Sequence, residues 1–144
     1  MIIPLERRRM LGGDRNAVPI CIEDKGRPLG FVLAVIDNGC PITALFPPAL
    51  KRMRVRIPDD AKKAIKPLIL GGLEFDVYPI GEKNIVFRDA ERKQVKLSAQ
   101  FNAAILRDKR KQFVSEFFDM LIGLDFLTQH KLNLDFAKPE LFTR

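Results

Sequence analysis

An eight-residue apolar run, residues 29–36, ends directly in the polar corner Asp37-Asn38-Gly39. The run contains β-branched residues and is shorter than a typical helix, so it predicts a buried strand. That strand would carry a carboxylate at its own end. A buried carboxylate is costly unless it is paired or hydrogen-bonded, so Asp37 needs either a local partner or a function. Asp-Asn-Gly is also a common hairpin corner, in which the turn backbone itself supplies the partner.

The rest of the chain consists of short apolar segments separated by turn residues. Ten Pro and nine Gly are spread over 144 residues, which favours many short elements. The pattern predicts an all-β chain with one or two short helices. Strands are expected at residues 17–23, 29–36, 42–46, 68–70, 73–80, 84–88, 94–99, 113–122 and 132–136. Short helical segments are expected at residues 47–52, 59–65 and 126–131.

Composition excludes several classes of protein and bounds the domain organisation. Residues 1–16 are polar and Arg-rich and predict an N-terminal arm, followed by a single domain over residues 17–144. The longest uncharged stretch, residues 38–50, is too short for a membrane span. Two Cys outside any CxxC pair, together with the single His130, leave no framework for disulfides or a His-based zinc site. We therefore expect a cytoplasmic protein with no metal, no cofactor and no membrane contact.

A second motif lies late in the chain, where Leu121-Ile122-Gly123 leads into an expected short helix. Together with residues 37–45 it resembles the retropepsin-like (retroviral-type) aspartic proteases. In that family a strand leads into Asp-Thr-Gly or Asp-Ser-Gly, a Thr or Ser usually follows six residues after the Asp, and two apolar residues and a Gly precede a late helix. Thr43 occupies the sixth position here. The resemblance covers residues 17–137 and is closest to cellular members, such as the protease domain of the DNA-damage-inducible shuttle proteins.

The resemblance implies the retropepsin fold, an acid-protease-like closed β-barrel that is an obligate homodimer. The family's mechanism needs two neighbouring carboxylates, and this chain supplies one such motif, so Asp37 of a second copy would complete the catalytic pair. The substrate would be an extended peptide or unfolded protein, covered by a flap for which we expect the charged hairpin at residues 84–98. The implied active-site loop is Asn38, Gly39, Cys40 and Thr43, and the implied supporting residues are Leu121, Ile122 and Gly123.

Asn38 departs from the family pattern, because its place is usually taken by a Thr or Ser whose hydroxyl bonds across the dimer axis. The alternative function is therefore a catalytically weak or silent member of the same fold that binds peptides or nucleic acid as a dimer. The net charge of +7 is compatible with nucleic-acid binding, which is the less favoured partner because the chain lacks interleaved aromatic residues. Cys40 is expected to be a packed small side chain. Asp125 and His130 are expected to have structural roles.

Overall fold

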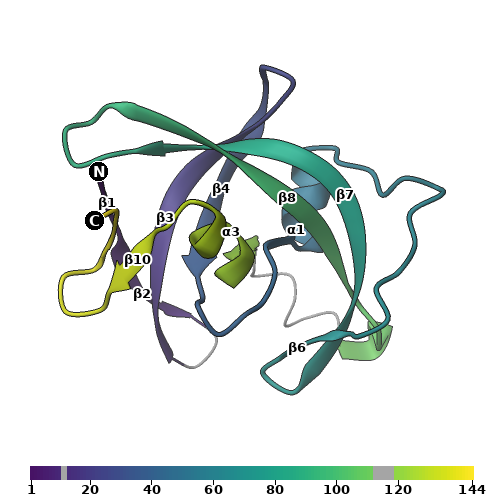
Figure 1. The fold of residues 1–144 in the computed structure, drawn as a ribbon. Coiled ribbons are helices and arrows are strands. Elements are labelled where there is room, and N and C mark those ends of the chain that lie inside the picture. The colour runs from purple at the N-terminus through teal and green to yellow at the C-terminus, as the bar shows by residue number, and fades with distance from the viewer. Residues whose placement is uncertain (11–12, 112–118) are drawn as a thin grey trace.

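The computed structural model describes residues 1–10, 13–111 and 119–144. The described residues are mainly β, as the sequence predicts, with short helical segments between strands (Figure 1). The strands are β1 (Ile2–Pro4), β2 (Glu6–Met10), β3 (Gly13–Asp24), β4 (Arg27–Ile36), β5 (Ala44–Leu45), β6 (Leu68–Leu70), β7 (Leu73–Arg88), β8 (Gln94–Leu106), β9 (Met120–Ile122), β10 (Asn133–Asp135) and β11 (Glu140–Phe142). The helical segments are α1 (Pro47–Arg52), the 3-10 turn η1 (Lys109–Lys111) and α3 (Leu124–Gln129).

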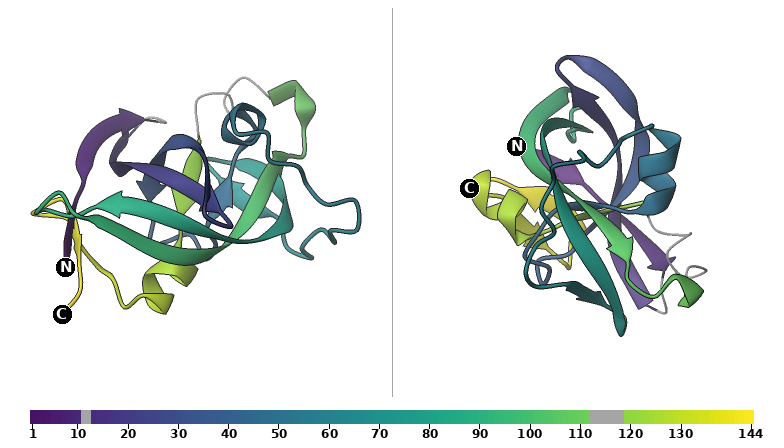
Figure 2. Two further views of the ribbon diagram at one scale, coloured as in Figure 1. Left: turned by 90° about the horizontal axis from the view of Figure 1, so that it is seen from above. Right: turned by 90° about the vertical axis from the view of Figure 1, so that its right-hand side faces the viewer.

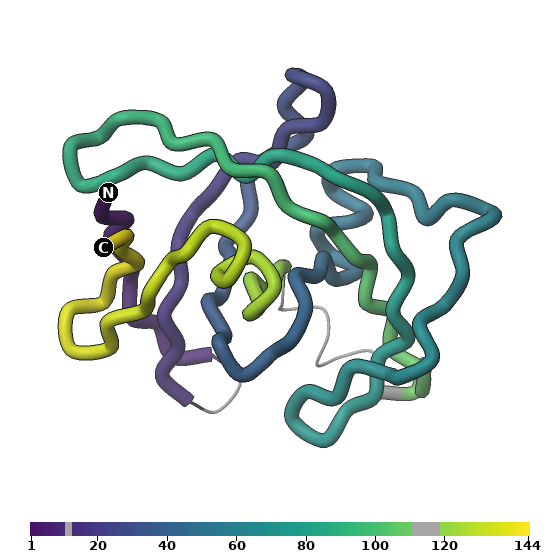
Figure 3. The backbone as a smooth tube through the Cα atoms, in the orientation of Figure 1, coloured from purple at the N-terminus to yellow at the C-terminus, as the bar shows by residue number. Residues whose placement is uncertain are grey.

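Most strands belong to one sheet, in the order β2-β3-β4-β9-β5-β8-β7-β6. In addition, β3 pairs with β7 over Cys21–Glu23, so the backbone pairings lead from β3 through β4, β9, β5, β8 and β7 back to β3. The main apolar cluster draws its side chains from these strands and from α1 and α3. A smaller sheet, β1-β11-β10, joins the two ends of the chain, which lie side by side in Figure 3.

The hairpin β3–β4 confirms the first predicted pair of strands. Its turn residues Lys25 and Gly26 both have positive φ (51° and 79°), the conformation that suits a tight turn between right-twisted strands. Toward its end β4 becomes buried, at Ala34, Val35 and Ile36. The strand therefore passes through the core and ends directly before Asp37.

The long strand β7 corrects the prediction of two separate strands at residues 73–80 and 84–88. The sequence between them contains Pro79 and Gly81, which normally mark a break. In the structure they mark a shift in register between β7 and β8, with Gly81 at φ 93°. The strand is bent there rather than ended. Figure 2 shows the resulting long, curved β7–β8 hairpin spanning the molecule.

The N-terminal segment contains two strands that the sequence did not predict, because residues 2–4 and 6–10 form β1 and β2. β1 pairs with β11, and β2 pairs with β3. β2 contains three consecutive Arg residues on a sheet edge with exposed side chains, so it lacks the apolar alternation by which a strand is recognised. Backbone pairing rather than burial holds it in place. The division into an arm (1–16) and a domain (17–144) stays a prediction.

Two further predictions concern residues 59–65 and 113–122. The first segment is not helical; it is mostly exposed, lies between Pro58 and Pro67, and so has no apolar face to bury against the core. Of the second, only the end is described, where β9 forms, and residues 113–118 lie outside the described residues.

Across the described ranges, no helix is long and apolar enough to cross a bilayer.

Candidate active site

The strand end at Asp37 lies in an arrangement of three adjacent strands from distant parts of the chain. β9 lies between β4 and β5, pairing with β4 in parallel and with β5 antiparallel. The loop of residues 37–43 leaves β4, passes the end of β9 and enters β5. The N–H of Asp37 donates to the carbonyl of Ile122 (3.0 Å), and the N–H of Leu124 donates to the carbonyl of Cys40 (2.7 Å). The loop is therefore held against the chain that follows β9.

Gly123 is the point of closest approach between these two segments. A Cβ atom at this position would lie 2.2 Å from the carbonyl oxygen of Ile42 and 2.7 Å from that of Cys40. The backbone of Gly123 has φ −100° and ψ −174°, which other residues adopt without strain. Glycine is therefore needed here for the space that it leaves, not for its conformational freedom. The sequence motif Leu121-Ile122-Gly123 pointed to this position.

Thr43 and Asp125 form the second connection across the same region. The Thr43 hydroxyl donates to Asp125 Oδ1 (2.8 Å) and accepts from the N–H of Gly123 (3.2 Å), while the Thr43 N–H donates to Asp125 Oδ2 (3.1 Å). Asp125 Oδ1 also accepts from the N–H of Phe126 at the start of α3 (2.7 Å). Thr43 is fully buried, so its hydroxyl is satisfied inside the fold. The contacts of Asp125 are those of a structural residue.

The Asp37 carboxylate is half-buried at the mouth of this loop, and Asn38 and Gly39 beside it are exposed. Its Oδ1 accepts a hydrogen bond from the N–H of Gly39 (2.9 Å), which is the local turn contact expected of an Asp-Asn-Gly corner. Within the described residues Asp37 makes no ion pair. One oxygen is thus oriented by the turn, while the carboxylate remains accessible from outside.

Cys40 lies inside the loop and is buried. Its thiol donates to the carbonyl of Ile42 (3.3 Å). Burial is the main reason that the pKa of the Cys40 thiol is raised, and the nearby carboxylates of Asp37 and Asp125 raise it further. A reactive thiolate requires the opposite shift. The side chain is thus a packed small group, as expected from the sequence.

We expect Cys40 to resist alkylation in the folded protein. Iodoacetamide at pH 8 should modify the half-buried Cys21 first and Cys40 only after unfolding. Burial raises the pKa of both thiols, so the difference in rate comes from the covered sulfur of Cys40. The raised pKa also means that the neutral thiol contributes to stability below its ordinary pKa, and that this contribution is lost as the pH rises toward the folded-state value. Peptide mass spectrometry of native and urea-treated samples measures both sites. Equal rates at Cys21 and Cys40 in the native state would contradict this expectation.

The charged hairpin at residues 84–98 is not placed over Asp37, which corrects its prediction as a flap. Its tip is ordered by Asp89 Oδ1, which accepts from the N–H groups of Glu91 and Lys93, and Ala90 donates to the carbonyl of Ile2 in β1 (2.8 Å). The tip therefore rests beside the chain ends, away from the loop of residues 37–43 (Figure 1). Charge at a hairpin tip indicates exposure, but it does not indicate position.

The hairpin β6–β7 lies beside the loop of residues 37–43. Its turn, Gly71-Gly72, has positive φ at both residues. Its apolar residues share a cluster with Cys40 and Ile42 of the loop; they are Leu68, Leu70 and Leu73. Apolar strands on both sides of a Gly-Gly turn were the signal in the sequence for this hairpin.

His130 lies at the end of α3 and takes no part in the loop. Its Nε2 is 2.6 Å from the carbonyl oxygen of Ser98, and its ring lies 4.7 Å from that of Phe126. Both contacts attach α3 to the core and to β8. Among the residues described, no group of three or more His, Cys, Asp or Glu side chains is arranged to hold a metal ion.

No family model and no curated protein matches this chain. Among solved structures, the chain is similar to EIAV protease complexed with the inhibitor HBY-793, with 14% sequence identity, coverage of 89% of this chain and 98% of that chain, and a TM-score of 0.47. It is also similar to the retroviral protease-like domain of Ddi1 from Leishmania major, with 14% sequence identity, coverage of 88% of this chain and 85% of that domain, and a TM-score of 0.48.

Proposed function

We propose that this chain is one subunit of a retropepsin-like aspartic endopeptidase in which Asp37 is the catalytic carboxylate. The observation that carries the proposal is the state of Asp37 itself. It stands at the end of a buried strand, one oxygen oriented by the Gly39 N–H, in a loop held by Gly123 and Thr43. A carboxylate that is fixed in position yet reachable from outside is suited to general acid–base chemistry.

Peptide hydrolysis by this mechanism needs a second carboxylate about 3 Å away, because two such groups share one proton. The ionised carboxylate would take a proton from water, and the protonated one would donate to the carbonyl oxygen of the scissile bond. Other Asp side chains near this region are already engaged: Asp125 with Thr43, and Asp119 with Arg52. The second carboxylate would therefore be Asp37 of another copy.

The proposed enzyme is thus a homodimer with its active site on a two-fold axis. Asn38 would face its own counterpart at that axis, where an amide can donate and accept hydrogen bonds as a hydroxyl does. Leu124, directly after Gly123, supports a subunit contact here, since this apolar side chain is 48% exposed beside the loop.

The proposal also includes a closed barrel, an extended substrate and a cytoplasmic location. The pairing of β3 with β7 supports closure of the sheet. The substrate would lie between the loop of residues 37–43 and the β6–β7 hairpin, paired as an added strand. Two free cysteines, Cys21 and Cys40, fit a reducing compartment.

A subunit-mixing experiment tests the shared site. Wild-type protein and the Asp37→Asn variant are unfolded together in equal amounts, refolded, and assayed on the oxidised B chain of insulin between pH 3 and 7, with products identified by mass spectrometry. If each site needs both Asp37 carboxylates, random pairing leaves activity at about one quarter of that of wild type at the same total concentration. Mixing with Asp14→Asn, which changes an exposed carboxylate elsewhere, should leave activity unchanged. A fall to one half would show that each subunit acts alone, and no cleavage by wild type in this range would contradict the proposed activity.

A further inference from the structure

The net positive charge of this protein comes from two segments of the chain. Residues 51–66 contain seven Lys or Arg and two Asp, and residues 107–111 contain four Lys or Arg and one Asp. The whole chain has 25 Lys and Arg and 18 Asp and Glu, so the other residues carry 14 cationic and 15 acidic side chains. Outside these two segments the chain is nearly neutral. The basic character is therefore a local property rather than a general one.

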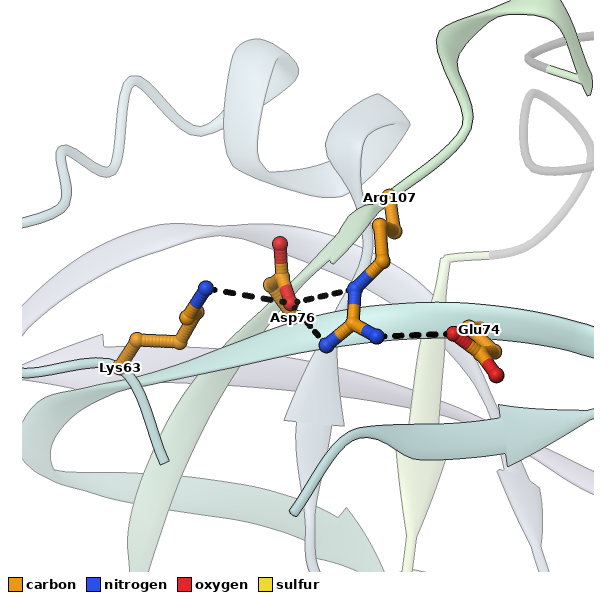
Figure 4. A network of polar contacts seen from close by, with 4 residues as sticks. All are labelled: Lys63, Glu74, Asp76 and Arg107. Atoms are coloured by element: carbon orange, nitrogen blue, oxygen red, sulfur yellow. Dashed lines mark hydrogen bonds and ion pairs between the residues drawn. The ribbon is translucent and has the colours of Figure 1, made fainter. Parts of the chain in front are cut away.

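The fold brings the two segments to the same end of the molecule. α1 and the chain of residues 53–67 lie at the end opposite the termini, together with η1, in the views of Figures 1 and 2. A polar network joins them directly (Figure 4): Asp76 of β7 contacts Lys63 (3.9 Å) and Arg107 (2.9 Å). Arg107 also contacts Glu74 (2.8 Å), and these carboxylates raise its pKa. We call this surface, residues 51–66 with 107–111, the basic end.

Several cations of the basic end make no ion pair with a described residue. The ion pairs between described residues on this surface involve Arg52, Lys63, Arg107 and Arg110. Within the described part of the chain, the exposed cations of the basic end without an ion pair are Lys51, Arg54, Arg56, Lys62, Lys66 and Lys109. A cluster of unpaired cations repels itself, and a bound polyanion relieves that repulsion.

The apolar residues of the same segment face inward, which bears on the kind of partner. Val55 and Ile57 alternate with Arg54 and Arg56 and pack against the main cluster, leaving the arginines outside. Ile65 is the one large apolar side chain that residues 51–66 expose in full. A protein partner usually requires a buried apolar centre to its interface. A phosphate backbone requires cations alone.

We propose that the basic end binds the phosphate backbone of nucleic acid, without sequence preference. This function is separate from peptide cleavage, because it uses no residue of the loop of residues 37–43. Five phosphate contacts would give a slope of about −4.5 for the logarithm of the affinity against the logarithm of salt concentration.

Fluorescence anisotropy with a labelled, random-sequence DNA duplex of 20 base pairs tests this surface. The triple variant Arg56→Ser, Lys62→Ser, Lys66→Ser removes three unpaired cations of the basic end. The triple variant Arg9→Ser, Arg15→Ser, Lys138→Ser removes three exposed cations elsewhere and gives the same net charge. We expect the first variant to lose at least tenfold in affinity at 50 mM salt, with a salt slope smaller in magnitude by about 3. The second variant should bind within about twofold of wild type.

Three results would overturn the proposal. Equal losses in the two triple variants would show attraction to net charge and no defined surface. Absence of binding by wild type at 20 mM salt would remove the surface as a nucleic-acid site. Two competitors of equal charge, an oligoglutamate and unlabelled duplex, can be compared for displacement of the labelled duplex. If the oligoglutamate displaces it at the lower concentration, the basic end would be a site for acidic proteins instead. Circular dichroism of both triple variants verifies that they are folded.

Discussion

Gly123→Ala is expected to destabilise the folded protein by more than about 3 kcal/mol, or to prevent folding altogether. The added methyl group would lie 2.2 Å from the carbonyl oxygen of Ile42 and 2.7 Å from that of Cys40. These are backbone atoms of a loop whose N–H and carbonyl groups are already bonded to the chain after β9, so they cannot move aside without breaking those bonds. Urea unfolding followed by circular dichroism, at one fixed protein concentration, measures the loss.

Gly13→Ala is the matched control for this substitution. A Cβ atom at Gly13 would meet only the side chain of Arg15, at 4.0 Å, and the glycine does not have positive φ. Its free energy of unfolding should stay within about 0.5 kcal/mol of wild type. A loss below about 1 kcal/mol for Gly123→Ala would mean that the loop of residues 37–43 is free to shift away from β9, and the rigid positioning of Asp37 would then be wrong.

In the proposed homodimeric peptidase, Asp37→Asn is expected to lower kcat/KM for peptide cleavage by at least about 10³-fold without loss of folding or dimerisation. An amide oxygen can still accept the hydrogen bond from the Gly39 N–H, so the turn should persist. The amide cannot take a proton from water, so the chemical step is lost. Initial rates on the insulin B chain, with the dimer measured by sedimentation, separate these effects.

Asp14→Asn makes the same chemical change on an exposed side chain and should leave kcat/KM unaltered. If Asp37→Asn retained a tenth or more of wild-type activity, the catalytic group would lie elsewhere. If it lost activity together with dimerisation, Asp37 would be a residue of the subunit contact rather than of the reaction. Neither result would bear on DNA binding by the basic end, whose test involves no cleavage.

The sequence allowed much of the local structure to be predicted, because local signals decide it. The run ending at Asp37 formed a strand, Pro47 and Pro48 opened α1, and Gly71-Gly72 turned a hairpin. Prediction failed where a distant partner decides the structure. β2 has three Arg and no apolar alternation, so only its pairing with β3 makes it a strand. The hydrogen bond of Asp125 to Thr43, 82 positions away, has no local signal at all.

The predicted flap failed for a related reason. Residues 84–98 did form a hairpin, as the pattern predicts, and its tip is charged. The position of that tip depends on the bend of β7 at Gly81 and on the hydrogen bond from Ala90 to Ile2. The second of these joins segments that are far apart in the chain. The motif around Gly123 was informative for a different reason. It was found through the resemblance to a family, which links residues 37–45 with residues 121–123 and so includes a contact between distant segments.

The pairing of β4 with β9 also has a consequence for biosynthesis. Asp37 leaves the ribosome early, but the strand that fixes it, Met120–Ile122, is made more than eighty residues later. A contact between such distant segments forms late and slowly during folding. In a nascent chain the Asp37 loop therefore lacks its β9 partner until Met120–Ile122 has been synthesised. For a peptidase, this delay would keep an incomplete chain from cleaving its neighbours on the same polysome.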